Sequence, residues 1–322
     1  MHDDTLLAIE DLTTVFDTAR GPAVAVDGVS LRLARGRTLA VVGESGCGKT
    51  VLSLSALGLI TPPGRVASGH AFFDGRDLPA LPEHERRTIL GRRASMIFQE
   101  PMTALNPVLT IGDQVSEPVR VHAGLSRRQA LEAAEAMLAQ VGLPDPGRRL
   151  AAYPHELSGG QRQRVMIAMA LILSPELLIA DEPTTALDVT VQRQILDLMV
   201  ELTRARDTAI ILVTHNLGVV AQTADTVAVM YSGRMVEQAP VAALFAEPLH
   251  PYTQGLLASL PRLDDPERGL TPIPGTVPSL FARPDGCHFH PRCARAFAPC
   301  RRDAPPLLAR PDGRQVRCWL YA

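Results

Sequence analysis

Lysine is almost absent from this sequence. Of its 32 lysine and arginine residues, only Lys49 is a lysine, and arginine carries the positive charge everywhere else. A compact ammonium fits a tight phosphate-binding loop better than a planar guanidinium does. The surroundings of Lys49 are therefore the first place to look for bound phosphate.

Aromatic residues and net charge are also scarce. Phe, Trp and Tyr make up 4% of the chain, and the formal net charge is −2. Recognition of nucleic acid relies on an excess of positive charge and on aromatic rings that stack on bases. The sequence therefore predicts no nucleic-acid partner.

Signals for export and for membrane insertion are missing as well. The chain starts with an acidic Met1-His2-Asp3-Asp4 instead of a basic and apolar leader, and its apolar run from Val165 to Leu173 is shorter than a membrane span. We therefore expect a protein that is soluble or lies at a membrane surface.

Cysteine occurs five times, and four of the five lie close together near the C-terminus. Cys47 stands alone, whereas Cys287, Cys293, Cys300 and Cys318 form the C-terminal group. In a chain without an export signal, such a group favours a metal site over a framework of disulfides.

The residues around Lys49 match a phosphate-binding loop. Leu39 to Val42 reads as a buried strand, Gly43 to Thr50 as G-x-x-x-x-G-K-T, and Val51 to Ile60 as an apolar helix. In this context the loop amides and the helix N-terminus surround phosphate. Lys49 would then reach the β- and γ-phosphates, and the Thr50 hydroxyl would ligate Mg²⁺. The alternative is a glycine-rich turn that binds no ligand.

Short strands lie on both sides of this loop. Residues 6 to 33 alternate between apolar and polar side chains around a turn at Gly21-Pro22, which predicts an antiparallel sheet. Phe16 in the first strand could stack on an adenine or pack as an ordinary half-buried strand residue. Residues 69 to 74 and 94 to 98 read as further strands, and the second of these leads into Gln99.

Helical periodicity dominates from Ile111 to Leu173, with Ser126 as a predicted N-cap. Residues 157 to 161 read Leu-Ser-Gly-Gly-Gln and open a further helix. Ser158 stands in the N-cap position, and the two glycines leave backbone N–H groups accessible at the helix N-terminus. This predicts either a second site for anions or an ordinary glycine-rich cap.

The next apolar strand, residues 177 to 181, delivers Asp181 and Glu182 at its carboxyl end. Adjacent carboxylates at such a position suit metal and water binding in an α/β sheet. A helix is predicted from Thr190 to Arg204, and a last buried strand, residues 209 to 214, ends at His215.

Together these residues resemble the ATP-binding subunits of ABC transporters. The similarity covers about residues 5 to 235 and includes the Walker A motif (Gly43–Thr50), the Q-loop (Gln99), the LSGGQ signature (Leu157–Gln161), Walker B (Leu177–Asp181 with Glu182), the D-loop (Ala186-Leu187-Asp188) and the switch histidine (His215). Residues 100 to 107, the Leu249-His250-Pro251-Tyr252-Thr253 segment and the cysteine tail resemble those of dipeptide and oligopeptide importers.

The resemblance implies an α/β fold. It is a P-loop NTPase core of the RecA-like kind, with an N-terminal antiparallel β-subdomain and an inserted helical subdomain at about residues 106 to 164. The ABC ATPase domain would span residues 1–235, and residues 236–322 would form a small C-terminal extension that carries the four cysteines.

The resemblance also implies a role for each motif residue. Glu182 would be the general base and His215 would contact the γ-phosphate, while Asp181 would join Thr50 and Gln99 around Mg²⁺. The nucleotide would be bound by Phe16, Gly43, Glu44, Ser45, Gly46, Cys47, Gly48, Lys49, Thr50 and Gln99. The residues implied to act on the ATP of a partner subunit are Ser158, Gly159, Gly160, Gln161 and, in the D-loop, Asp188.

Peptide uptake driven by ATP hydrolysis is the implied activity. The partners would be a second ABC ATPase subunit, identical or paralogous, two transmembrane permease subunits and an extracytoplasmic substrate-binding protein. The chain would lie on the cytoplasmic side of the cell membrane as a peripheral protein. Import of nickel or another small solute, and a soluble ABC ATPase without a transport role, are the alternatives.

The C-terminal cysteines follow the pattern C-x5-C-x6-C-x17-C. From chemistry alone, four thiolates suit a structural Zn²⁺ or an iron–sulfur cluster, and unligated cysteines are the third reading. The resemblance favours a [4Fe–4S] cluster on Cys287, Cys293, Cys300 and Cys318, because several dipeptide and oligopeptide importer ATPases carry one in this extension.

Overall fold

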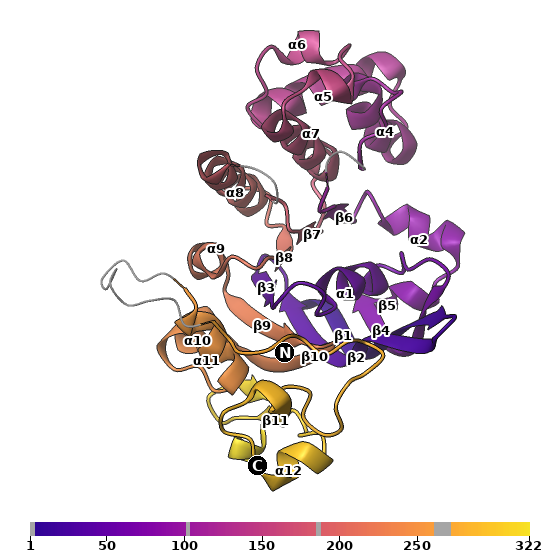
Figure 1. The fold of residues 1–322 in the computed structure, drawn as a ribbon. Helices are drawn as coiled ribbons and strands as arrows, with labels where there is room; N and C mark the ends of the chain where they lie inside the picture. Colours follow the sequence, from indigo (N-terminus) through magenta and orange to yellow (C-terminus); the bar gives the residue numbers. More distant parts are fainter. Residues whose placement is uncertain (1–3, 101–103, 185–187, 261–271) are drawn as a thin grey trace. The chain divides into compact units, whose positions relative to one another are not determined.

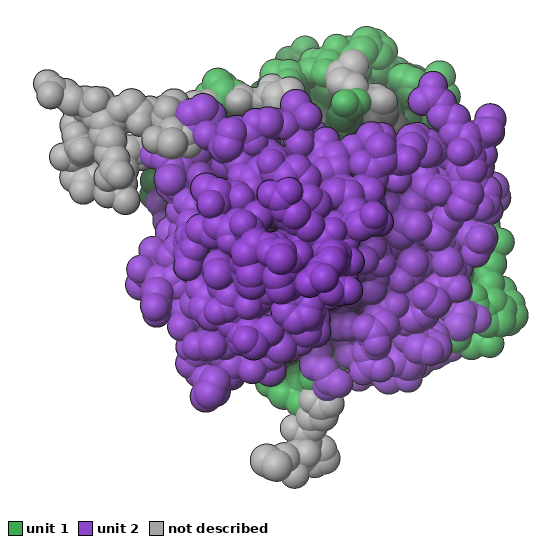
Figure 2. Space-filling model, turned by 60° about the horizontal axis from the view of Figure 1, so that its bottom comes forward, with its two compact units in different colours: residues 1–6, 33–38, 81–213 green, residues 7–32, 39–80, 214–322 purple. Residues whose placement is uncertain are grey.

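The structure is a computed structural model that describes residues 4–100, 104–184, 188–260 and 272–322. It consists of two compact units, each built from several stretches of the chain (Figure 2). The first unit comprises residues 1–6, 33–38 and 81–213. The second unit comprises residues 7–32, 39–80 and 214–322.

An antiparallel sheet forms one part of the second unit. Its strands are ordered β2-β1-β4-β5, and β1 and β4 pair from Leu7↔Phe73 to Phe16↔Gly64. The turn after β4 has positive φ angles at Asp74 and Gly75, as expected for an Asp-Gly turn. The strand bounds are Thr5–Thr18 (β1), Gly21–Ala34 (β2), Gly64–Phe73 (β4) and Arg76–Asp77 (β5). The predicted sheet is present, although β2 already begins at Gly21, where a turn was expected.

The strand that leads into the phosphate-binding loop belongs to a second sheet. Within this unit β3 pairs in parallel with β9, β9 pairs with β10, and β10 pairs with β12, which in turn pairs with β11. The chain's C-terminal residues thus extend the sheet that positions the loop. The bounds are Thr38–Val42 (β3), Thr226–Tyr231 (β9), Arg234–Pro240 (β10), Leu308–Ala309 (β11) and Gln315–Val316 (β12).

Helices and an apolar core complete the second unit. The core joins β3, β9 and β10 to Tyr252 and Phe289 of the C-terminal region. Figure 1 places α10 and α11 beside the C-terminal segment that contains β11 and α12. The helix bounds are Lys49–Ala56 (α1), Leu217–Thr223 (α9), Val241–Ala246 (α10), Pro251–Ala258 (α11) and Ala298–Arg302 (α12).

Three parallel strands form the centre of the first unit. In the order β6-β7-β8, they span Ala94–Ile97, Leu177–Asp181 and Ala209–Val213, and every residue of β7 and β8 is buried. Such uniformly apolar strands are typical of a parallel sheet covered on both faces. Their carboxyl ends lie at one edge, where Gln99 follows β6 and Glu182 follows β7.

The helices of the first unit include the predicted helical segment. Helices α4, α5, α6 and α7 gather at one end of this unit (Figure 1). The Ser126 side chain caps α5 as predicted, in a capping box with Gln129. The bounds are Glu83–Ile89 (α2), Ile111–Ala123 (α4), Arg127–Gln140 (α5), Pro146–Arg149 (α6), Gly159–Leu171 (α7) and Val189–Arg204 (α8). Among the described residues, no helix is long and apolar enough to cross a membrane.

Candidate functional site

The phosphate-binding loop runs from the end of β3 to the start of α1, as predicted. Its shape requires glycine at two positions where the loop comes very close to other backbone atoms. A Cβ on Gly43 would lie 2.3 Å from the carbonyl oxygen of Met230, and one on Gly48 would lie 2.6 Å from that of Ala25. Both glycines also have positive φ angles, of 153° and 106°. No L-residue side chain fits either position without moving the backbone.

Lys49 turns back into this loop. Its ammonium donates to the carbonyl oxygens of Gly43 at 2.9 Å and Glu44 at 3.2 Å, and the residue is 6% exposed. The positive charge therefore lies inside the curve of the loop. Cys47 is also buried, and burial raises the pKa of its thiol, so it packs as a neutral side chain.

Phe16 lies on β1, opposite Gly64 of β4. The ring is half-buried, and a Cβ on Gly64 would lie 2.7 Å from it, so the ring packs directly over that glycine. This contact accounts for an aromatic residue at this strand position without a ligand. Stacking on adenine stays a prediction.

In the first unit the predicted Q-loop and catalytic glutamate are brought together. The Gln99 side-chain amide donates to a carboxylate oxygen of Glu182 at 3.0 Å. Asp181, the last residue of β7, is 1% exposed, whereas Glu182 is half-buried and has a φ of 45°. A non-glycine residue in this left-handed region is uncommon and marks a position that the surrounding structure constrains.

The LSGGQ residues form the N-terminus of α7. Ser158 is the N-cap, and its backbone N–H donates to the Gln161 side chain at 3.0 Å while its hydroxyl accepts the Gln161 N–H at 3.4 Å. This capping box confirms the predicted cap. The chain passes close to α8 at Gly160, where a Cβ would lie 2.9 Å from Val191.

The D-loop and the switch histidine are the last two predicted motifs. Asp188 caps α8 by accepting the Val191 N–H at 2.9 Å, while Ala186 and Leu187 of the predicted D-loop lie outside the described residues. His215 is an exposed residue of the second unit, directly before the Asn216 N-cap of α9.

The four C-terminal cysteines line one small cavity and form no disulfide. Burial, together with the charges of the neighbouring cysteines, raises the pKa of Cys287 to about 11. The predicted metal site is not confirmed. Within the ranges that the structure describes, no group of three or more His, Cys, Asp or Glu side chains is placed to hold a metal ion.

Two contacts to the phosphate-binding loop were not predicted from the sequence. Arg292 forms an ion pair with Glu44 at 2.7 Å, and the Tyr252 hydroxyl accepts the Glu44 N–H at 2.9 Å. Tyr252 stands in the importer-like segment after Leu249. No spacing rule links it or Arg292 to residue 44, so the family resemblance was the only signal that could have pointed to either residue.

Two protein families match this chain. The family "ABC transporter" matches residues 26–185, and the family "Oligopeptide/dipeptide transporter, C-terminal region" matches residues 236–300.

Individual relatives are similar to this chain over nearly its whole length. The dipeptide transport ATP-binding protein DppD of Bacillus subtilis is 52% identical over 98% of this chain and 95% of its own length. DppD of Escherichia coli is 47% identical over 97% of this chain and 96% of its own length. A solved dimeric structure of a bacterial ABC transporter cassette matches 73% of this chain and 98% of its own with a TM-score of 0.66 at 25% identity.

Proposed function

The chain belongs to the ATP-binding subunits of dipeptide and oligopeptide ABC transporters, and on this premise we propose that it hydrolyses ATP to drive peptide uptake. The observation that carries the proposal is the similarity to dipeptide transport ATP-binding proteins over nearly the whole chain. Because these relatives are named for dipeptides, peptides are favoured over nickel or another small solute, and transport over a soluble role.

The phosphate-binding loop is the part of the chain that binds ATP. Its amides and the Lys49 ammonium are the groups that neutralise the phosphates, and the Thr50 hydroxyl is the first oxygen ligand offered to Mg²⁺. Asp181 and Gln99 supply further oxygen atoms, which are the ligands that Mg²⁺ prefers. The bound ion supplies positive charge for the phosphate oxygens. The remaining loop residues and Phe16 contact the nucleotide.

Glu182 is the general base that takes a proton from the attacking water. Its bond from Gln99 at 3.0 Å supports this role, because it orients the carboxylate. The left-handed backbone of Glu182 supports it as well, since strained residues cluster at active sites. His215 contacts the γ-phosphate and holds Glu182.

A second ATPase subunit, identical or paralogous, completes each ATP site. Ser158, Gly159, Gly160, Gln161 and Asp188 act on the ATP that the partner's loop holds. The capping box at Ser158 supports this role, because it fixes the end of α7 whose amides would face the phosphate. The similarity to a dimeric ABC transporter cassette supports the dimer.

The other partners are two transmembrane permease subunits and an extracytoplasmic substrate-binding protein. We place the chain on the cytoplasmic side of the membrane, where the ATP is. The helical segment of α4 to α7 is the part that moves the permease as ATP is bound and released. Co-purification with two multi-span subunits checks this assignment, whereas co-purification with ribosomes or DNA would support a soluble role instead.

The hydrolytic role is tested with Glu182→Gln. This substitution removes the base but keeps the size and a polar group, so ATP binding should persist while steady-state hydrolysis falls at least about 100-fold. Phosphate release and ATP binding are measured on the same preparation. A variant that turns over at the wild-type rate would show that Glu182 is not the base.

We also propose that the four tail cysteines hold a [4Fe–4S] cluster, with Zn²⁺ as the alternative. The support is that all four line one cavity and that thiolates suit both groups. Iron and labile sulfide are assayed in protein purified without oxygen, and the Cys293→Ser variant is the comparison. Stoichiometric zinc, or protein without metal, would overturn the cluster.

A further inference from the structure

The C-terminal segment that carries the cysteines also holds the phosphate-binding loop. Arg292 directly precedes Cys293, yet its guanidinium donates to both carboxylate oxygens of Glu44, at 2.7 and 3.0 Å. The Arg292 side chain is 5% exposed and that of Glu44 is 30% exposed. This two-pronged, largely buried geometry is that of the strong class of ion pairs.

Contacts with neighbouring residues other than Glu44 also fix the Arg292 side chain. Its Nε donates to the carbonyl oxygen of Pro274 at 2.8 Å, and its guanidinium lies 5.8 Å from the Tyr231 ring centre and 6.0 Å from that of Phe289. Tyr231 and Phe289 pack edge to face, with ring centres 5.2 Å apart. The position of this positive charge is therefore set by the C-terminal segment rather than by Glu44 alone.

A second bond holds the backbone of the same loop residue. The Tyr252 hydroxyl accepts the Glu44 N–H at 2.9 Å, and the Tyr252 ring packs against Tyr231 and Phe289. Tyr252 is fully buried, and burial raises the pKa of its phenol, so it stays neutral. Both the backbone and the side chain of Glu44 are thus bound by residues outside the loop.

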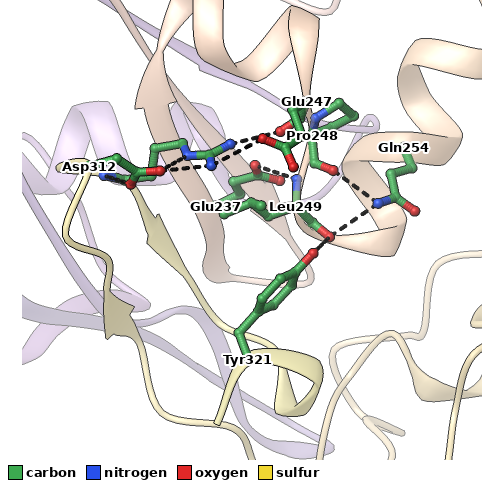
Figure 3. A network of polar contacts seen from close by, with 8 residues as sticks. Glu237, Glu247, Pro248, Leu249, Gln254, Asp312 and Tyr321 are labelled. Carbon is green, nitrogen blue, oxygen red and sulfur yellow. Dashed lines mark hydrogen bonds and ion pairs between the residues drawn. The ribbon is translucent and has the colours of Figure 1, made fainter.

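The end of the chain secures the segment that delivers Tyr252 (Figure 3). Buried Glu237 accepts the backbone N–H groups of Leu249 and His250, each at 2.8 Å, and the Tyr321 hydroxyl donates to the Leu249 carbonyl oxygen at 3.0 Å. Nearby, Arg314 forms ion pairs with both Asp312 and Glu247. The C-terminal residues therefore fix the start of α11, and through it Tyr252.

The charge on Glu44 gives this arrangement a consequence for nucleotide binding. A carboxylate in a loop that receives phosphates repels them, and the repulsion is stronger in a partly buried site than in water. Arg292 neutralises this carboxylate and fixes its direction. We propose that Arg292 is a positioning residue that sets the nucleotide affinity of the loop, so that the C-terminal segment and the nucleotide are energetically coupled.

This coupling rests on the proposed binding of ATP at the loop, and the test separates the two. ADP is titrated onto the full chain by calorimetry with Mg²⁺ present, because ADP fills the phosphate-binding loop without being hydrolysed. Wild type and Lys49→Ala come first. A wild type that binds no ADP would overturn the proposed function together with the coupling.

The central comparison is a cycle of charge changes. Arg292→Gln keeps an amide donor but removes the charge, and we expect a loss of ADP affinity of about tenfold, a typical coupling for a close charge pair. Arg292→Lys should retain most of the affinity. Adding Glu44→Gln to Arg292→Gln should bring the affinity back to within about threefold of wild type, because the repelling carboxylate is gone. Arg301→Met, an exposed arginine on α12, is the matched control and should bind as wild type does.

Two results with the Arg292 variants would overturn the proposal while wild type still binds ADP. One is unchanged affinity in Arg292→Gln. The other is a loss that Glu44→Gln does not restore, which would mean that Arg292 only supports the fold. Glu44→Gln alone is the arm that does not depend on how the Arg292 variants fold. It leaves the positive charge of Arg292 beside the loop and should bind ADP more tightly, so a weaker binding would also contradict the proposal.

Discussion

Gly48 shows how little freedom the phosphate-binding loop has at the level of one residue. It caps α1 with a φ of 106°, and a Cβ there would meet the backbone of Ala25 at 2.6 Å. We predict that Gly48→Ala costs roughly 2–4 kcal/mol, from backbone strain and from overlap. It should lower the melting temperature and abolish ADP binding.

Gly46 is the matched control for that substitution. It also has a positive φ, of 76°, but no atom lies within 4 Å of its would-be Cβ. Gly46→Ala should therefore lower the stability of the fold only through backbone strain, by about 1–2 kcal/mol. Equal melting temperatures for the two variants would show that the close approach at Gly48 has no energetic weight.

The Lys49→Arg substitution tests whether this position requires an ammonium group or only a positive charge. Its ammonium occupies a small space between two carbonyl oxygens, and a guanidinium is larger and planar. We predict a fall in the ATPase rate of about 100-fold or more, the usual cost of losing a preorganised charge in an active site. Circular dichroism should show an intact fold. Normal turnover by Lys49→Arg would contradict the assigned role.

At the level of single residues, the sequence predicted those whose roles follow from a short motif around them. The loop glycines, Lys49 and the adjacent acids at the end of β7 all follow from short motifs. Arg292 could not be predicted, because its partner Glu44 is 248 positions away and only the folded chain brings the two charges together. Several arginines follow residue 282, and no local pattern distinguishes the one that reaches the loop.

At the scale of elements, Glu176 joins the starts of β6 and β7. Its carboxylate accepts from Arg93 at 2.5 and 3.0 Å and from Arg35 at 2.9 Å. The hydrogen bond from Arg93, with smaller contributions from Arg35, holds the pKa of Glu176 below its usual range. A carboxyl group with a lowered folded-state pKa stabilises the fold above its unfolded pKa and loses that contribution as the pH falls through the folded value.

Glu176→Gln tests this ion-pair group. The group is partly exposed, so its contribution is expected to be about 0.5–1 kcal/mol. Melting temperatures of wild type and variant should differ at pH 7 and converge as the pH falls below the usual pKa range of a glutamate, where Glu176 of the folded wild type becomes protonated. A constant difference from pH 7 to pH 3 would show that the variant acts through packing instead of charge.

Helix starts were easier to predict than strand pairing. Ser126 and Ser158 each cap a helix with a glutamine three residues later, and both bonds are local in sequence. By contrast, β12 is only Gln315–Val316, and its pairing with Glu237 and Gln238 depends on the fold of the whole C-terminal segment. Two residues carry no periodicity from which such a strand could be predicted.

At the level of the whole molecule, the proposed transporter combines this nucleotide-binding chain with partner subunits that are separate chains. None of the helices within the described ranges is long and apolar enough to span a membrane. Two relatives are named dipeptide transport ATP-binding proteins, and they match 98% and 97% of this chain. Together with the proposed role of Glu182, this similarity leads to the proposal that ATP hydrolysis at Glu182 drives peptide uptake.

The most direct test of that claim is uptake of a radiolabelled dipeptide into vesicles that contain this chain, its partner ATPase, both permease subunits and the binding protein. We predict uptake that requires ATP and is lost when Glu182→Gln replaces the wild-type chain, although the complex still assembles and binds ATP. Uptake that continues at the wild-type rate with Glu182→Gln would contradict this prediction.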